Sequence, residues 1–554
     1  MLRTAVRYYY QIKFLKLVQI YARVRKRLGK PTLKSCTATP AMRAASGVWV
    51  RPALMPHDRL DDHQFVMLGE ERTLSLPDDW HNRELGKKWL MELHTFNLLC
   101  GNNAHSAHDL MLDWITHNQQ LDSPGWHQYM TSQRIGNWIK WSLQGNPLDT
   151  VVRTSIVQQV GYLLQVLAYD ETDHKLFNNA KALLFAAYVL DDKDSDRWRE
   201  KGWMLIHQYC IELLGDDGGY IGLSPMYHCS LLLDMLDIAN LLQAYGETLP
   251  GYLNEAIVSA RRWLTNMCHP DGNLALFNDA AFAVVAAPAD LQQYAVRLGY
   301  TPVSAGPDGL LHLADSGFAR MAMGPAVAMV DIGKIGPDHA ASHGHADTLT
   351  FELSLKNRRI IVDTGLSTYE KMPERLLLRS TAAHNTVVLD NRNSSDVWGL
   401  FKVGRRASII ESTQTAQPDR LLVGATHDGY CRPGNRLLHR REWLMTVDKL
   451  TITDELTGRG SHRAEIFYHL HPDIAVTQLG SNRYALDSGP EGPQCELELD
   501  PALQVKTLHY DHHPAFNRAI LATCLVASYQ GVLPKVFISH LNWQTASALS
   551  GAHK

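Results

Sequence analysis

The densest group of residues that could carry out chemistry is the segment 339–347, which reads HAASHGHAD. In an extended chain His343, His345 and Asp347 point to one face, because side chains alternate with a period of two. Two imidazoles and a carboxylate on one face are typical of a metal site or an acid–base group. Asp363 and His384 lie in two nearby segments and complete the set, and such donors with water favour Zn²⁺. The alternative is a group of surface or hydrogen-bonding histidines.

A second candidate group follows the segment 218–226, which reads GGYIGLSPM. Gly and Pro end one helix there, so Tyr227 and His228 fall at the start of the next. A tyrosine beside a histidine is a candidate proton-transfer pair, because nearby cations lower the pKa of a phenol. The alternative is an ordinary helix start with a packed aromatic side chain.

A third group occupies residues 126–138, which read WHQYMTSQRIGNW. Aromatic, amide and guanidinium groups together suit a pocket for a sugar or a carboxylate, with Arg134 as a bidentate donor. The alternative is a helix with one polar and one apolar face.

The elements that must position these residues change type along the chain. From about residue 89 to 298 apolar residues recur at i, i+3, i+4 and i+7, with short Gly, Pro, Asp and Asn breaks, which predicts an array of antiparallel helix pairs. After about residue 305 the period becomes two. The segment 349–355 alternates strictly and predicts a half-buried antiparallel strand, and several similar segments follow.

We therefore predict a multidomain α+β protein with three regions. A basic helix and a connecting region occupy residues 1–80, a helical domain occupies 81–305, and an antiparallel β-sandwich occupies 306–554.

Composition excludes several classes of protein. The 554 residues include 54 Lys+Arg, 57 Asp+Glu and 27 His, which gives a net charge of −3 and disfavours a nucleic-acid partner. The eight cysteines form no CxxC pair, so a thiolate zinc site is excluded and buried free thiols are the better interpretation. No apolar run reaches the length of a membrane span.

The first thirty residues contain nine Lys and Arg residues and no acidic residue. Lys13 and Lys16 interrupt the apolar stretch that a cleavable secretory signal would need. A basic amphipathic helix fits better, and it predicts peripheral contact with an anionic membrane surface. The alternative is a solvated helix that packs on the rest of the protein.

Three segments, SPMYH (224–228), HGHADTLTFELSLKNRRIIVDTGLSTYE (343–370) and RSTAAHNTVVLD (379–390), resemble the heparinase II/III-like polysaccharide lyases. The resemblance implies an incomplete (α/α) toroid followed by a β-sandwich, with the active site between them. It also implies β-elimination at a uronic acid of an acidic polysaccharide. Tyr227 and His343 match the proton-transfer residues of the family, and Tyr369 matches a second tyrosine that lines the site. The family's zinc ligands, which are mainly structural, match His345, Asp363 and His384.

The chain departs from the family pattern at two places. Relatives often carry an Asn-His pair before the helix at 176–187, and the Asn helps to neutralise the substrate carboxylate. Here an ungapped comparison places His174 and Lys175 there, and a shift of one residue places Asp173 and His174. A cationic side chain would still neutralise a carboxylate, whereas Asp173 would oppose it. Many relatives also have a Glu where this chain has Gly222.

We expect four residues to bind substrate: His174, Lys175, Arg134 and His228. The departures motivate a second hypothesis, a non-catalytic or weakly catalytic glycan-binding protein in surface-polysaccharide biosynthesis. A glycoside hydrolase is a third hypothesis, but it needs two carboxylates across the scissile bond and no such pair is recognisable. The resemblance implies a location in the cell envelope or periplasm, and the missing signal leaves the cytoplasm as the alternative.

Overall fold

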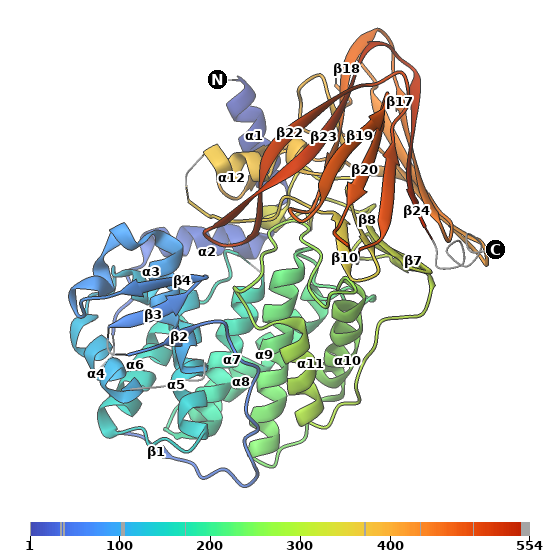
Figure 1. The fold of residues 1–554 in the computed structure, drawn as a ribbon. Coiled ribbons are helices and arrows are strands. Elements are labelled where there is room, and N and C mark those ends of the chain that lie inside the picture. The colour runs from blue at the N-terminus through green and yellow to red at the C-terminus, as the bar shows by residue number, and fades with distance from the viewer. Residues whose placement is uncertain are drawn as a thin grey trace, which may run out of the picture.

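The computed structural model describes residues 2–33, 36, 39–61, 63–100, 106–171, 173–370, 373–432, 434–490 and 492–544. Helices form the lower half of the molecule and antiparallel sheets form the upper half (Figure 1). The predicted order of a helical part and a C-terminal antiparallel β-sandwich is confirmed. The last helix of the helical part, α11, ends at Arg297 and the first strand of the sheet part begins at Gly309, so the predicted boundary at 305 lies between them.

Helix α7 (His174–Val189) is the centre of the helical part and packs against α5, α6, α8 and α9. Every residue of α7 except Lys175 is buried, because small and apolar residues occur on all of its faces. Around it the described chain places α3 (Lys87–Thr95), α4 (Ala107–His117), α5 (Gln128–Leu143), α6 (Thr150–Val166), α8 (Ser195–Leu213), α9 (Pro225–Ala244), α10 (Gly251–Asn266) and α11 (Pro288–Arg297).

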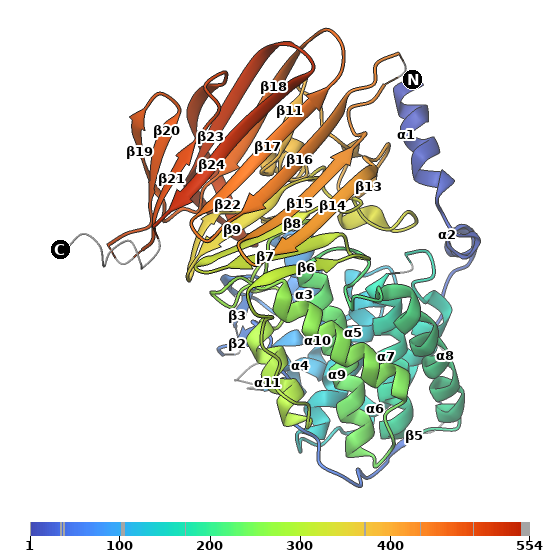
Figure 2. The ribbon, with the colours of Figure 1, turned by 90° about the vertical axis from the view of Figure 1, so that its right-hand side faces the viewer.

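The N-terminal region contains two helices and a small sheet. Helix α2 (Leu17–Leu28) lies on the outside of the molecule near the level where the two halves meet, and α1 (Leu2–Lys13) lies beside the sheet part (Figure 2). A three-stranded sheet of β2 (Asp58–Arg59), β3 (Gln64–Met67) and β4 (Glu70–Thr73) follows, and β1 (Ala41–Met42) pairs with β5 (Leu190–Asp191).

Three main sheets form the upper half. A five-stranded sheet in the order β10-β9-β8-β7-β6 packs one face on α10, where Phe318 and Met329 share a core with Trp263 and Met267. An eight-stranded sheet (order β14-β15-β16-β17-β24-β21-β20-β19) and a four-stranded sheet (order β11-β18-β23-β22) enclose the second core. Their strands are β14 (Ile409–Gln417), β15 (Arg420–His427), β16 (Leu438–Met445), β17 (Lys449–Thr457), β18 (Ser461–His469), β19 (Ala475–Gly480), β20 (Arg483–Asp487), β21 (Gln494–Glu498), β22 (Gln504–Ala515), β23 (Arg518–Val532) and β24 (Lys535–Trp543). The strands used below are β6 (Gly309–Leu313), β7 (Phe318–Met323), β8 (Ala326–Asp331), β9 (Phe351–Leu355), β10 (Arg358–Ile361), β11 (Val387–Leu389), β12 (Val397–Trp398) and β13 (Lys402–Val403).

Strand β9 corrects the prediction of a half-buried strand, because all five of its residues are buried. Its apolar face joins the core of the β-sandwich. Its polar face meets the helical part instead of water: Glu352 and Ser354 contact the two ring nitrogens of His269, at 2.6 and 2.7 Å. The alternation of apolar and polar residues therefore predicts the strand correctly. It does not predict that the helical part covers the polar face.

Among the described residues, no helix has the length and apolar character needed to cross a membrane.

Candidate active site

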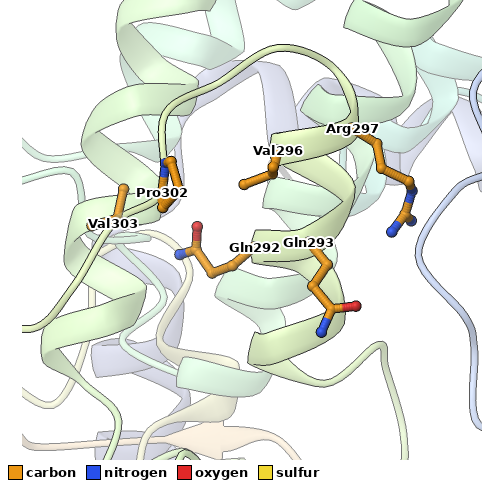
Figure 3. Close-up of a pocket in the computed structure, with 6 residues that line it drawn as sticks. All are labelled: Gln292, Gln293, Val296, Arg297, Pro302 and Val303. Carbon is orange, nitrogen blue, oxygen red and sulfur yellow. The ribbon is translucent and has the colours of Figure 1, made fainter.

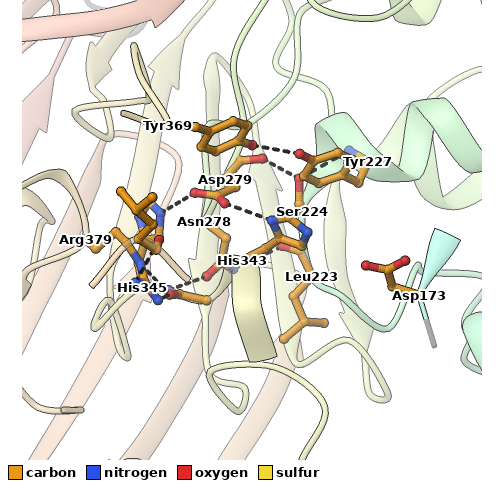
Figure 4. A network of polar contacts seen from close by, with 12 residues as sticks. Asp173, Leu223, Ser224, Tyr227, Asn278, Asp279, His343, His345, Tyr369 and Arg379 are labelled. Atoms are coloured by element: carbon orange, nitrogen blue, oxygen red, sulfur yellow. Dashed lines mark hydrogen bonds and ion pairs between the residues drawn. The ribbon is translucent and has the colours of Figure 1, made fainter. Parts of the chain in front are cut away.

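The predicted catalytic residues meet where loops of the helical part face loops of the sheet part (Figure 4). Tyr227 lies in the first turn of α9, His343 ends a short 3-10 turn before β9, and Tyr369 follows β10. The hydroxyl oxygens of Tyr227 and Tyr369 are 2.8 Å apart. The ring centroids of Tyr227 and His343 are 4.3 Å apart. The structure thus brings all three into one group.

The start of α9 fixes the position of Tyr227. Ser224 caps the helix: its Oγ accepts the backbone N–H of Tyr227 at 3.2 Å and donates to the carbonyl oxygen of Asp279 at 2.5 Å. Burial raises the pKa of Tyr227, and the nearby Lys88 partly offsets this. The departure at Gly222 has a steric cause, because a Cβ there would lie 2.3 Å from the ring of Tyr220.

Asp279, a residue that sequence reasoning missed, organises the histidines. One carboxylate oxygen lies 2.9 Å from Nδ1 of His343, and the other lies 2.9 Å from Nε2 of His345. Arg375 pairs with the same carboxylate at 2.7 Å. Burial opposes ionisation, yet Arg375 and the two imidazoles hold the pKa of Asp279 well below its ordinary value. A lone Asp in the segment FNDAAF has no spacing relation to its partners, so no pattern marks it.

The segment 341–345 differs from the extended chain expected from its pattern. Residues Ala341–His343 form a 3-10 turn, and the two histidines converge because both bond Asp279. Nδ1 of His343 is held by this bond, while its Nε2 is buried and has no hydrogen-bond partner among the described residues. An imidazole nitrogen without a partner is the type of atom that a general acid or base uses.

The positions of residues 173–175 bear on the departure from the family's Asn-His pair. Asp173 caps α7 by accepting the backbone N–H of Lys175 at 2.9 Å, and His174 stacks on Tyr227 with ring centroids 4.5 Å apart. Lys175 turns back to Asp173, at 2.9 Å, and also pairs with Glu171. Burial lowers the pKa of His174 to about 3, so this imidazole is neutral. Asp173 and His174 therefore face the site, and Lys175 is shared between two carboxylates.

The predicted zinc ligands lie behind the catalytic group and are fully buried. The ring centroids of His345 and His384 are 5.3 Å apart, and Nδ1 of His384 lies 2.7 Å from Asp363. Nδ1 of His345, Nε2 of His384 and both carboxylate oxygens of Asp347 are buried without a hydrogen-bond partner among the described residues. Burial raises the pKa of Asp347 to about 7. Such unsatisfied nitrogen and oxygen donors are the chemistry that a metal ion satisfies.

One other group of donors lies at the catalytic residues. Ligand atoms of Asp173, His174 and His343 are all within 4.8 Å of one another, which makes them the one set of at least three His, Cys, Asp or Glu residues so close in the described chain. The predicted zinc ligands His345, Asp363 and His384 are not as close together. Lys175 already pairs with Asp173. The Asp173 carboxylate therefore already has a cationic partner without a metal ion.

Two predicted substrate-binding residues are not brought to the site. Arg134 is fully buried inside the helical part, where it donates to the carbonyl oxygens of His94 and Gly125 and stacks over Trp114. His228 is also buried, with Nε2 2.9 Å from the carbonyl oxygen of Ala260.

A separate shallow pocket of about 440 Å³ lies on α11 (Figure 3) and contains none of the predicted site residues. Its lining consists of Gln292, Gln293, Val296, Arg297, Pro302 and Val303.

The fold and the site together define a class of protein: helices capped by antiparallel sheets, with tyrosines and a histidine at the junction. A solved structure of heparinase III shares this fold, with a TM-score of 0.67 and 15% identity, covering 95% of this chain and 89% of that one. Family models for the heparinase II/III N-terminus and the heparinase II/III-like C-terminal region match residues 125–296 and 305–530. The chain belongs to the heparinase II/III-like family.

Two curated relatives are similar in sequence. A heparin-sulfate lyase of Bacteroides stercoris is 25% identical over 361 residues, covering 59% of this chain and 51% of the relative. A heparin-sulfate lyase of Pedobacter heparinus is 29% identical over 291 residues, covering 47% of this chain and 43% of the relative. The chain thus spans about half the length of these relatives.

Proposed function

We propose that the protein is a polysaccharide lyase that cleaves a uronic-acid-containing glycan by β-elimination. The observation that carries the proposal is the contact of Tyr227 with both Tyr369 and His343 at the junction of the two halves. The names of the two curated relatives, both heparin-sulfate lyases, support the substrate class.

The reaction removes the proton from C5 of the uronate, breaks the C4–O bond and forms a C4=C5 double bond. His343 is suited to accept the C5 proton, because Asp279 holds its Nδ1 and leaves Nε2 open. Tyr227 keeps its proton at neutral pH and donates it to the departing glycosidic oxygen. The hydroxyl of Tyr369, at 2.8 Å, orients that of Tyr227.

The uronate carboxylate must be neutralised before its α-proton becomes acidic. We assign this role to His174, a neutral imidazole that donates a hydrogen bond, and to the ammonium group of Lys175. Asp173 works against both, because it places a negative charge beside His174 and pairs with Lys175. We infer that this chain binds its carboxylate more weakly than a chain with Asn at this position.

His345, Asp363 and His384, together with Asp347, would hold a zinc ion behind the catalytic group if their donor atoms, which are not all within 4.8 Å of one another in the described chain, closed around it. The ion would cross-link the loop before β9, the end of β10 and the loop before β11, which is a structural role. By fixing His345 it would also fix Asp279, and through Asp279 the catalytic His343.

The test is incubation of the purified protein with a panel of uronate-containing glycans, followed by assay of unsaturated uronate ends. Release of such ends by the wild type, and not by Tyr227→Phe, is the expected result. Glycan affinity without turnover, unchanged in Tyr227→Phe, would instead identify a glycan-binding protein.

A further inference from the structure

Helix α2 presents its apolar side to solvent. Leu17, Tyr21, Val24 and Leu28 are 84%, 68%, 50% and 82% exposed. Their spacing of i, i+4, i+7 and i+11 places them on one stripe of the helix. A helix that packs on a globular protein normally turns such a stripe inward, so α2 is turned the opposite way.

The polar side of α2 holds it against the protein. Gln19 is 1% exposed, and its amide nitrogen donates to the carbonyl oxygens of Glu171 and His339, at 3.3 and 3.2 Å. Lys26 pairs with Asp170 at 2.6 Å. These contacts with the helical part and the sheet part fix the rotation of α2 about its axis. Because the polar side faces the protein, the apolar stripe faces solvent.

Helix α1 repeats the arrangement. Tyr9 and Ile12 are exposed, whereas Arg7 on the other side forms a two-pronged ion pair with Asp396, at 2.7 and 2.9 Å. Lys402 of β13 contacts the ring of Tyr8. Both helices are thus attached by polar contacts and leave large apolar side chains uncovered.

The charge of this surface indicates what covers it. The first thirty residues carry nine basic residues and no acidic one, and Lys13, Arg25, Arg27 and Lys30 are exposed near the apolar stripe. Apolar side chains flanked by Lys and Arg are the pattern of helices that lie in the interface of an anionic bilayer. At 12 residues each, the helices are about 18 Å long and suit a position along the interface.

We propose that α1 and α2 form a docking surface for an anionic lipid membrane. The stripe of Leu17, Tyr21, Val24 and Leu28 enters the acyl boundary, and the flanking basic residues contact lipid headgroups. The protein is then held on the membrane by its N-terminal helices, while the junction that carries Tyr227 remains accessible to a polymer. This inference is independent of the lyase activity.

The experiment is co-sedimentation of the full chain with vesicles of phosphatidylcholine alone or with about one-third phosphatidylglycerol. We expect binding to the anionic vesicles, at least about tenfold weaker binding to the neutral ones, and weakening by salt. The double substitution Leu17→Glu/Leu28→Glu should reduce partitioning at least about tenfold, because it removes two large apolar groups and adds two negative charges.

The matched control is Leu479→Glu, which adds a charge at an exposed apolar residue of β19 (Ala475–Gly480), on the opposite side of the molecule from α1 and α2 (Figure 2). It should bind anionic vesicles as the wild type does, and circular dichroism should show that each variant is folded. Equal binding of the wild type and the double variant would overturn the proposal. Two other results would also overturn it. One is self-association in the absence of lipid that the double substitution abolishes, and the other is binding to an acidic polysaccharide, but not to vesicles, that the double substitution abolishes.

Discussion

His343 and His345 are two residues apart in the chain, but they serve different environments. His343 faces Tyr227 and His174, and its Nε2 has no hydrogen-bond partner among the described residues. His345 faces His384 in a group with no exposure to solvent, and burial lowers its pKa to about 3. We propose proton transfer for the first imidazole, whereas the second is neutral at neutral pH.

A single carboxylate serves both environments. Asp279 bonds both imidazoles, so the position of the proposed catalytic ring depends on the same side chain as the position of the proposed metal-binding ring. Gly344 between them allows the chain to pass close to Ile335, whose carbonyl oxygen would lie 2.2 Å from a Cβ at position 344. His343 and His345 are therefore separated by the directions of their side chains, one toward Tyr227 and the other toward His384, and not by distance along the chain.

The largest effect should come from the residues around His343. Tyr227→Phe removes the hydroxyl that protonates the leaving oxygen, and His343→Ala removes the base. Each should lower kcat by about 10²–10⁴-fold. Steady-state assays on the best glycan substrate measure this, and metal content should stay at the wild-type level. A variant of either residue with near wild-type kcat would refute the assignment.

Asp279→Asn should affect both environments at once. It leaves Arg375 without its buried anion, which typically costs about 3–5 kcal/mol of stability, and it releases both imidazoles. Chemical denaturation should show this loss, and kcat should fall together with metal content. If kcat fell while metal content and stability were unchanged, Asp279 would not link the two sites.

His384→Ala should affect mainly the structural group around His345. A bound ion at about 100 times its Kd stabilises a protein by about 3 kcal/mol, and this contribution should disappear from the variant. Thermal unfolding with and without a chelator provides the measurement, since the chelator should lower the Tm of the wild type but not of the variant. A chelator effect of equal size in both proteins would argue against metal binding at His384.

Asp173→Asn should increase activity. The substitution keeps a side-chain oxygen to cap α7 but removes a negative charge beside the proposed carboxylate site. At an effective dielectric of about 20 a charge at about 5 Å contributes about 3 kcal/mol, and partial compensation by Lys175 leaves an expected gain of about tenfold in kcat/KM. Kinetics on an acidic glycan test this, with Asp196→Asn, an exposed position on α8, as the control. A fall in kcat/KM would mean that Asp173 supports binding.

Candidate site residues could be predicted from the sequence where they lie in contiguous motifs. HGHAD, SPMYH and STYE led to residues that the fold brings together, namely Tyr227, His343 and Tyr369. Asp279 could not be found in this way, because its partners lie 64 and 66 residues away and only the folded chain defines the bonds. The guanidinium of Arg134 suggests substrate binding, because it can donate two hydrogen bonds to a carboxylate. However, α5 is buried on nearly all sides, and the guanidinium donates to backbone carbonyl oxygens of the core.

The fold was predictable at the level of periodicity. The change from helical to alternating spacing near residue 305 corresponds to the change from α11 to β6. The burial of both faces of β9 was not predictable, because it depends on how the helical part covers the sheet. The outward rotation of α2 was likewise hidden, since an amphipathic pattern does not say which side meets the protein.

The proposed β-elimination at Tyr227 can be distinguished from hydrolysis by mass spectrometry of the cleaved glycan. Elimination predicts a new non-reducing end that is lighter by one water than a hydrolysis product and carries the C4=C5 double bond, formed by the wild type and not by Tyr227→Phe. Ends of hydrolytic mass, or unsaturated ends formed equally by Tyr227→Phe, would contradict this mechanism.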